Sequence, residues 1–287
     1  MLHSIEIENF QGIKHLNIEK LNQITIIGGK NNTGKTSVLR AIKDLFYFKN
    51  KDKYEDLNKH YDLNDENIIK LIGKYFFKKE YIKNLIMDCS LGCSSSDENF
   101  DQIVYGFRIN FISTNQMEEY KKAIEKFIEI FKLKRETQII ECMKIIDSNI
   151  STIHLIENEI YIDYNNKNER LPANLSGEGL LRLFTLAVAI ATSPNGIVLI
   201  DEFENGLHWS TLTKVWEFIA AASKEFNCQI ICTTHSYELL RYANDVMQKN
   251  NIDLGYIRLS KKDEELKAYH FDQESIDDAL SSDLEVR

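Results

Sequence analysis

The sequence lacks any apolar run long enough to cross a lipid bilayer. Its longest strongly apolar stretch, from Leu183 to Ala191, is well short of the roughly 20 residues that a membrane-spanning helix needs. The N-terminus also lacks the charged start and the apolar run of a secretory signal peptide. These two absences predict a cytoplasmic protein that has no contact with a membrane.

Cysteine is scarce and present in an odd number. Five cysteines in a chain without a secretory signal argue against a disulfide framework, so we interpret them as reduced thiols. Cys89 and Cys93 form a C-x-x-x-C pair, which is compatible with a metal site. Because no second ligand pair follows at a suitable spacing, ordinary strand and turn cysteines are the favoured interpretation.

The chain also has no excess of positive charge. It carries 35 Lys and Arg against 44 Asp and Glu, a formal net charge of −9. This balance argues against a protein that coats nucleic acid nonspecifically, although it leaves room for a local basic groove. With 287 residues, 43% of them hydrophobic and 28% charged, the chain is long enough for one large domain or two small ones.

One stretch organises the rest of the chain: Gly29-Lys30-Asn31-Asn32-Thr33-Gly34-Lys35-Thr36. It fits the phosphate-binding P-loop pattern G-x-x-x-x-G-K-[ST], in which glycines let backbone N–H groups surround phosphate oxygens. Lys35 is predicted to contact the β- and γ-phosphates, and the Thr36 hydroxyl to ligate Mg²⁺. A buried strand over 23–28 and an amphipathic helix over 36–48 flank the loop, so the phosphates would lie at a helix N-terminus.

A second group of motifs lies in the C-terminal half. Leu175-Ser176-Gly177-Glu178-Gly179 precedes a helix over 180–191 that is apolar nearly all round and therefore buried. The strand expected over 197–200 ends in Asp201 and Glu202, at the sheet edge where α/β proteins bind ligands. Asp201 is predicted to support Mg²⁺ and Glu202 to activate the attacking water. A further buried strand from 229 ends at His235, which would hydrogen-bond the γ-phosphate.

Hydrophobic periodicity predicts the remaining elements. The N-terminal 28 residues are expected to form antiparallel strands with a turn near Gln11-Gly12, and 49–67 a solvated excursion. The segments that follow are a helix over 68–77, strands over 85–89 and 103–111 around a loop over 92–99, helices over 117–133 and 135–148, a hairpin around 157–159 and a helix over 210–224. The helical pair is either a solvated element packed on the core or a contact platform for a partner or DNA, and it is too short for a coiled-coil arm.

The order of these motifs resembles the ATP-binding-cassette (ABC) type of ATPase head. In that class the P-loop, 175–179, Asp201-Glu202, 204–208 and His235 correspond to Walker A, signature, Walker B, D-loop and H-loop, and Ser176 lies 25 residues before Asp201, a typical spacing. More closely, the motifs Ser-Gly-Glu-Gly-Leu, Leu-Ile-Asp-Glu-Phe-Glu-Asn-Gly-Leu-His and Thr-Thr-His-Ser are similar to small AAA-annotated ATPases related to the OLD (overcoming lysogenization defect) and SMC groups. The segment 257–287 is similar to the C-terminus of that group.

The resemblance implies an α/β P-loop NTPase of the ABC-head type, with a mixed central sheet, an antiparallel β subdomain and a short helical insertion. A single ATPase domain in two lobes is expected, with an N-terminal lobe over 1–114, the insertion over 115–150 and a C-terminal lobe over 151–287.

The site residues that the motifs imply fall into three groups. The resemblance implies that ATP is held by Gly29, Asn31, Asn32, Thr33, Gly34, Lys35, Thr36 and Ser37 of one subunit and by Ser176, Gly177 and Glu178 of a second subunit. Mg²⁺ is expected to be held by Thr36 and Asp201, and the expected catalytic residues are Glu202 and His235. Because ABC heads sandwich two ATP molecules, a homodimer or a higher even-numbered oligomer follows.

Three departures from the family pattern stand out. Gln11 occupies a position where relatives often carry Arg or Lys, Glu178 replaces the glycine of the transporter signature, and the Q-loop glutamine has only Gln102 as a weak candidate.

The leading hypothesis is a Mg²⁺-dependent ATPase that acts as a dimerisation switch in bacterial antiphage defence. It would control a separate nuclease or toxin effector, because the chain ends soon after the ATPase core. The alternative is an SMC-like head for DNA repair or chromosome maintenance, for which DNA is the ligand and a basic groove is required. A transporter energy subunit would need a membrane partner, and a small-molecule kinase would leave 176–179 and His235 without a purpose.

Overall fold

The computed structural model describes residues 1–47, 70–77, 81–88, 92–95, 108–262 and 265–281. The expected excursion over 49–67, Cys89 and Gln102 lie outside these residues. No helix in the described part of the chain is long and apolar enough to cross a membrane.

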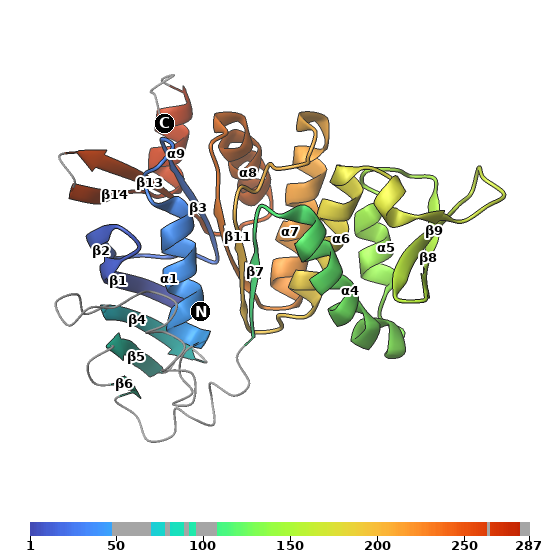
Figure 1. The fold of residues 1–287 in the computed structure, drawn as a ribbon. Helices are drawn as coiled ribbons and strands as arrows, with labels where there is room; N and C mark the ends of the chain where they lie inside the picture. Colours follow the sequence, from blue (N-terminus) through green and yellow to red (C-terminus); the bar gives the residue numbers. More distant parts are fainter. Residues whose placement is uncertain (48–69, 78–80, 89–91, 96–107, 263–264, 282–287) are drawn as a thin grey trace.

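A six-stranded sheet forms the centre of the molecule (Figure 1). Its strands follow the order β14, β13, β3, β12, β11, β7, and every neighbouring pair is parallel except β13 and β14. Their bounds are β3 (Ile24–Gly29), β7 (Ile109–Ile112), β11 (Ile197–Ile200), β12 (Gln229–Thr233), β13 (Leu254–Lys262) and β14 (Glu265–Phe271). This mixed sheet confirms the predicted fold class.

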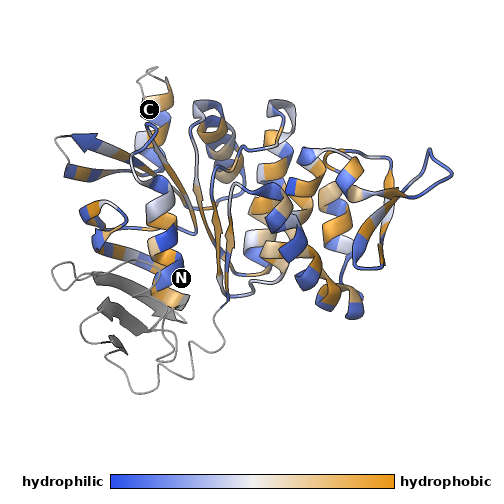
Figure 2. Cartoon of the chain, in the orientation of Figure 1, coloured by the Kyte–Doolittle hydropathy of each residue, from blue (hydrophilic) through white to orange (hydrophobic). Residues whose placement is uncertain are grey.

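The central strands are buried on both faces, which explains their continuous apolar sequences. Alternate residues of one strand enter different cores: Val198 and Ile200 face one hydrophobic cluster, whereas Ile197 and Leu199 face the other. In Figure 2 these strands are almost entirely hydrophobic in colour, while the outer faces of the helices are hydrophilic. The sheet therefore separates two layers of packed side chains.

One face of the sheet is covered by α1 (Lys35–Tyr47) and by an antiparallel sheet of order β2, β1, β4, β5, β6. The strands of this second sheet are β1 (Leu2–Phe10), β2 (Ile13–Ile18), β4 (Lys70–Phe77), β5 (Tyr81–Asp88) and β6 (Gly92–Ser95). The buried Gln229 side chain connects this sheet to the central sheet. Its amide oxygen accepts from the Leu2 N–H and its amide nitrogen donates to the Leu2 carbonyl, both at 2.7 Å.

The opposite face carries the other helices and a small sheet. The helices are α4 (Gln116–Lys132), α5 (Thr137–Met143), α6 (Glu178–Ala191), α7 (Leu212–Glu225) and α8 (Tyr237–Lys249), with α9 (Gln273–Ser281) near the C-terminus. The small antiparallel sheet consists of β8 (Ile150–Ile156), β9 (Glu159–Tyr164) and β10 (Leu171–Pro172). Helix α6 is central, with α4 and α5 packed against it (Figure 1).

Several sequence-based boundaries were wrong. Residues 70–77 form strand β4 rather than a helix, because the segment pairs with β1 on one side and β5 on the other. Apolar spacing over so short a run fits either element, and the long-range pairing decides between them. Gly92–Ser95 is strand β6 rather than loop, and the helix expected over 135–148 spans only Thr137–Met143.

Candidate functional site

The P-loop connects the end of β3 to the start of α1 at the carboxyl edge of the central sheet. Three of its residues have positive φ: Gly29 (137°), Asn32 (63°) and Gly34 (84°). A Cβ at Gly29 would lie 2.4 Å from the Leu259 carbonyl oxygen, so only glycine fits there. The loop thus has the tight curvature that turns successive N–H groups toward one point.

Lys35 lies inside this loop with only 6% of its surface exposed. Its Nζ donates to the Gly29 carbonyl at 2.8 Å and to the Lys30 carbonyl at 2.9 Å. Burial lowers the pKa of Lys35, whereas three nearby carboxylates raise it: Asp201, Glu202 and Glu204. The buried cation is therefore positioned by the loop itself, with an excess of negative charge beside it.

Asp201 follows β11 and meets the start of α1. Its two carboxylate oxygens accept from the Thr36 hydroxyl at 3.1 and 2.9 Å, and one of them also accepts from the Thr233 hydroxyl at 2.7 Å. Asp201 is buried, with 4% of its surface exposed. The pair of a threonine hydroxyl and a carboxylate, 165 residues apart in the chain, is a set of hard oxygen ligands suited to Mg²⁺.

Glu202 and His235 face the same edge from neighbouring strands. The Glu202 backbone has φ of 46°, an uncommon conformation for this residue type, and its N–H donates to the Thr233 hydroxyl at 2.8 Å. Its carboxylate is 4.0 Å from His235 Nε2, and both side chains are partly exposed, at 44% and 35%. A carboxylate held at this strained turn and open to solvent is positioned to contact water.

Glu204 connects the loop that follows Glu202 to the segment that contains His235. Its carboxylate accepts from the Thr234 hydroxyl at 2.9 Å and from the His235 N–H at 2.8 Å. The preceding Phe203 is fully buried and stacks on Trp216, with ring centroids 4.4 Å apart. The sequence analysis assigned no separate role to Glu204. In the structure, its two hydrogen bonds hold the backbone at Thr234 and His235 in place.

Arg182 is a second residue that sequence reasoning missed. Its guanidinium is buried within α6, and one nitrogen donates to the carbonyls of both Asp201 and Glu202 at 2.9 Å. Burial lowers the pKa of Arg182 to about 10. The sequence did contain a sign of this role, because Arg182 is the one charged side chain within the apolar run of this helix. It links the helix that begins at 178 to the acidic end of β11.

The signature residues begin α6, on the face of the central sheet opposite to α1 (Figure 1). Gly177 is the N-cap residue with φ of 99°, and Glu178 lies in the first turn. The Ser176 hydroxyl accepts a hydrogen bond from Tyr164 and donates one to the Pro172 carbonyl. The structure thus brings Lys35, Thr36, Asp201, Glu202 and His235 together. Glu178 lies instead beside Gly206, because a Cβ placed at Gly206 would be 3.6 Å from the Glu178 Cβ.

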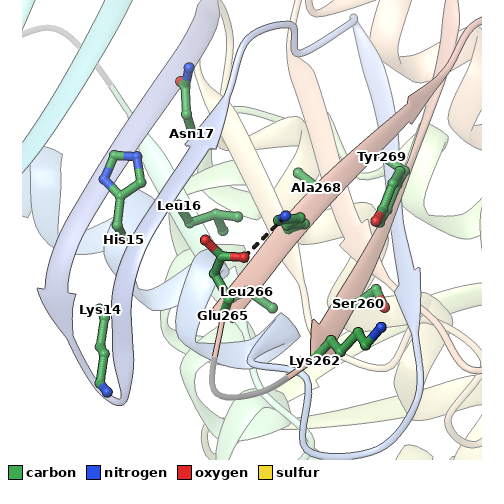
Figure 3. Close-up of a pocket in the computed structure, with 11 residues that line it drawn as sticks. Lys14, His15, Leu16, Asn17, Ser260, Lys262, Glu265, Leu266, Ala268 and Tyr269 are labelled. Carbon is green, nitrogen blue, oxygen red and sulfur yellow. Dashed lines mark ion pairs between the residues drawn. The ribbon is translucent and has the colours of Figure 1, made fainter.

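A groove lies beside the P-loop, between the edge strands β2 and β14 (Figure 3). Leu266 connects the two features, because it lines the groove and would lie 3.7 Å from a Cβ placed at Gly34. The groove has a volume of about 890 Å³ and is lined by Lys14, His15, Leu16, Asn17, Ser260, Lys262, Glu265, Leu266, Lys267, Ala268 and Tyr269. Three lysines and one glutamate make it locally basic, and none of the predicted site residues lines it.

The described residues fit a Mg–nucleoside triphosphate. The curved P-loop with its buried lysine suits phosphate oxygens, and glycine at 29 permits this curvature because a Cβ there would clash with the Leu259 carbonyl. The Thr36 hydroxyl and the Asp201 carboxylate provide oxygen ligands of the kind that Mg²⁺ takes.

Comparison with known proteins identifies the family to which these motifs belong. Residues 95–241, just over half of the chain, match the family model described as "AAA domain, putative AbiEii toxin, Type IV TA system". Residues 1–138 match the model of an "AAA ATPase domain". A protein of Helicobacter pylori described as an "ATP/GTP phosphatase" is 22% identical over 337 residues, covering 88% of this chain and 90% of the relative.

Solved structures show the same fold at low sequence identity. The SMC head in a crystal structure with the C-winged helix domain of ScpA is 14% identical, with a TM-score of 0.61, and the match covers 98% of this chain and 99% of that one. The SMC head domain from Thermotoga maritima is also 14% identical, with a TM-score of 0.60 and coverage of 94% and 98%. The fold is that of an SMC head, and by its matched sequence the chain belongs to the AAA-domain ATPase family that the model over 95–241 defines.

Proposed function

We propose that this protein is a Mg²⁺-dependent ATPase whose heads dimerise around ATP and so act as a switch. The observation that carries this proposal is that the nucleotide-binding motifs converge at one edge of the central sheet, whereas the signature residues begin a helix on the face opposite to α1. Lys35, Asp201 and Glu202 converge at one edge, whereas the start of α6 at 177–178 lies across the sheet from α1. Because that helix start has no phosphate to serve within one chain, a second copy would supply it.

Each residue group has a defined task in this proposal. The P-loop N–H groups and Lys35 hold the phosphates, and Thr36 and Asp201 hold Mg²⁺, which neutralises charge on the β- and γ-phosphates when bound. Glu202 accepts the proton of the attacking water. His235 donates to the γ-phosphate, while Arg182 keeps the Asp201–Glu202 backbone fixed through its two carbonyl contacts. Ser176, Gly177 and Glu178 of the second head complete the site.

The finer biological role is also part of the proposal. We infer a function in bacterial antiphage defence, in which the ATP-bound dimer controls a separate nuclease or toxin effector, as the resemblance to OLD-type ATPases implies. The matched family model carries a toxin of a type IV system in its description, and a structural neighbour of the same fold was crystallised with a bound partner domain. Both findings support a head that works with a second protein.

The solution mass of Glu202→Gln, with and without Mg-ATP, tests the switch. The slowed variant is expected to be a monomer without nucleotide and a dimer with Mg-ATP. Adding Ser176→Arg is expected to abolish the dimer, because a bulky cation replaces the hydroxyl that would face the γ-phosphate of the other head. Multi-angle light scattering measures both states.

Ser151→Arg is the matched control, since it makes the same change at an exposed serine of β8; it should leave the ATP-dependent dimer intact. A mass that never responds to ATP in the Glu202→Gln parent would overturn the switch.

A second candidate function, an SMC-like head that binds DNA, is favoured by the basic groove of Figure 3. If it holds, a labelled DNA duplex should bind with an affinity that falls steeply as salt rises. Replacing both Lys14 and Lys262 with Glu should weaken binding at least about tenfold and reduce the salt slope by about 2.

Lys132→Glu with Lys134→Glu, at exposed positions near the end of α4, is the control for net charge and should bind much more tightly than the groove variant. Fluorescence anisotropy across a salt series gives both quantities. Binding that does not depend on salt, or that the groove variant retains in full, would contradict this candidate.

A further inference from the structure

Tyr164 lies directly against the signature serine. It is the last residue of β9, has 7% of its surface exposed, and belongs to the hydrophobic cluster that packs around α6. Its phenolic hydroxyl donates to Ser176 Oγ at 3.1 Å. The hydroxyl of Ser176 in turn donates to the Pro172 carbonyl at 3.4 Å. A buried tyrosine thus ends in a polar contact with a residue that the ATPase motifs single out.

The small sheet brings these two side chains together. Strand β10 pairs antiparallel with β9, with Leu171 opposite Ile162 and Pro172 opposite Tyr161. A short 3₁₀ turn, Ala173–Leu175, follows, and the Ser176 N–H donates back to the Ala173 carbonyl at 3.0 Å. The chain therefore returns toward the end of β9 before α6 begins. The contact between Tyr164 and Ser176, which are 12 residues apart in the chain, therefore depends on the strand register and on this turn.

The direction of the hydrogen bonds matters for chemistry. A serine hydroxyl has one proton and two lone pairs. Tyr164 occupies a lone pair, so the Ser176 proton remains available to an acceptor on another side. Its present acceptor, the Pro172 carbonyl, lies at 3.4 Å, beyond the range of about 2.5–3.0 Å that is usual for O–H donors. A hydroxyl that accepts one hydrogen bond is also a stronger donor of the next.

We propose that Tyr164 is a positioning residue for the signature serine. By donating to Ser176 Oγ it sets the rotamer of that hydroxyl and directs its proton toward the γ-phosphate of ATP bound to the second head. When the heads meet, the Ser176 hydroxyl keeps its proton and changes its hydrogen-bond acceptor from the Pro172 carbonyl to a phosphate oxygen. The inference rests on the proposed dimerisation around ATP and assigns to the β8–β9–β10 sheet the task of presenting the signature loop.

The test is a double-mutant cycle on the dissociation constant of the ATP-bound dimer, measured by sedimentation in the Glu202→Gln background. Tyr164→Phe is expected to weaken the dimer about three- to tenfold for each of its two ATP sites, the usual effect of one hydrogen bond per site. In a Ser176→Ala background the same change should have no further effect, because Tyr164 acts only through that hydroxyl. In the chain with Glu202 intact, Tyr164→Phe should raise the protein concentration for half-maximal hydrolysis and leave the plateau rate unchanged.

Tyr161→Phe is the matched control, since it removes the same hydroxyl from the same strand, opposite Pro172 rather than at Ser176; it should leave the dimer unchanged. If Tyr164→Phe causes the same loss with Ser176 intact and in the Ser176→Ala background, the proposal is overturned and dimerisation still stands. A dimer that remains as tight after Tyr164→Phe as in the Glu202→Gln parent would also overturn the Tyr164 proposal and leave dimerisation standing. If the Glu202→Gln parent forms no dimer with Mg-ATP, dimerisation around ATP has failed, and the Tyr164 proposal falls with it.

Discussion

Replacing Glu202 with Gln is expected to slow ATP hydrolysis by about 10²–10⁴-fold while ATP binding persists. The substitution keeps the size of the side chain and removes its ability to accept a proton from water. The backbone of Glu202 is held without its carboxylate, through the Thr233 hydroxyl and the Arg182 guanidinium, and the carboxylate itself lies 4.0 Å from His235 Nε2. Phosphate release at saturating Mg-ATP gives the rate, and calorimetric titration gives the affinity.

Glu217→Gln provides the control for Glu202→Gln, because it makes the same change at an exposed position of α7. Its hydrolysis rate should equal that of the parent. A near-parental rate in Glu202→Gln would remove Glu202 as the general base. The carboxylate of Glu204 would then be the next group to consider, although it is already bonded to Thr234 and to the His235 N–H.

Lys35→Ala is expected to weaken ATP binding by about 30-fold or more. Truncating one partner of a buried, hydrogen-bonded charge pair typically costs about 2–5 kcal/mol of binding free energy, and every 1.4 kcal/mol is about tenfold in affinity. Lys35 would meet the phosphates from inside the P-loop, where only 6% of its surface is exposed. Removing it also leaves three carboxylates near the phosphate position without their cation: Asp201, Glu202 and Glu204.

Lys30→Ala separates this effect from a general loss of positive charge. Lys30 is exposed in the same loop, so its removal should change affinity far less than that of Lys35. Titration of a fluorescent ATP analogue compares the two variants, and urea unfolding checks that both are folded. Equal affinities for the Lys35 and Lys30 variants would contradict the assignment of Lys35 to the phosphates.

The sequence alone was sufficient for features that depend on contiguous residues. The P-loop is one strand, one glycine-rich turn and one helix, and its spacing requires no distant partner to be recognised. The apolar strand that ends in Asp201-Glu202 and the buried helix over 180–191 are likewise local, since burial on all sides leaves a continuous apolar run. The mixed sheet followed from the resemblance that these motifs carry.

Only the tertiary structure decided which distant side chains meet. Residues 70–77 became a strand because β1 and β5 lie on either side of them. Thr233 reaches Asp201 because β11 and β12 are parallel neighbours in a fixed register. Arg182 reaches the end of β11 because α6 packs across the sheet. These contacts depend on strand order, register and helix placement, which arise from packing over the whole chain and leave little trace in local residue patterns.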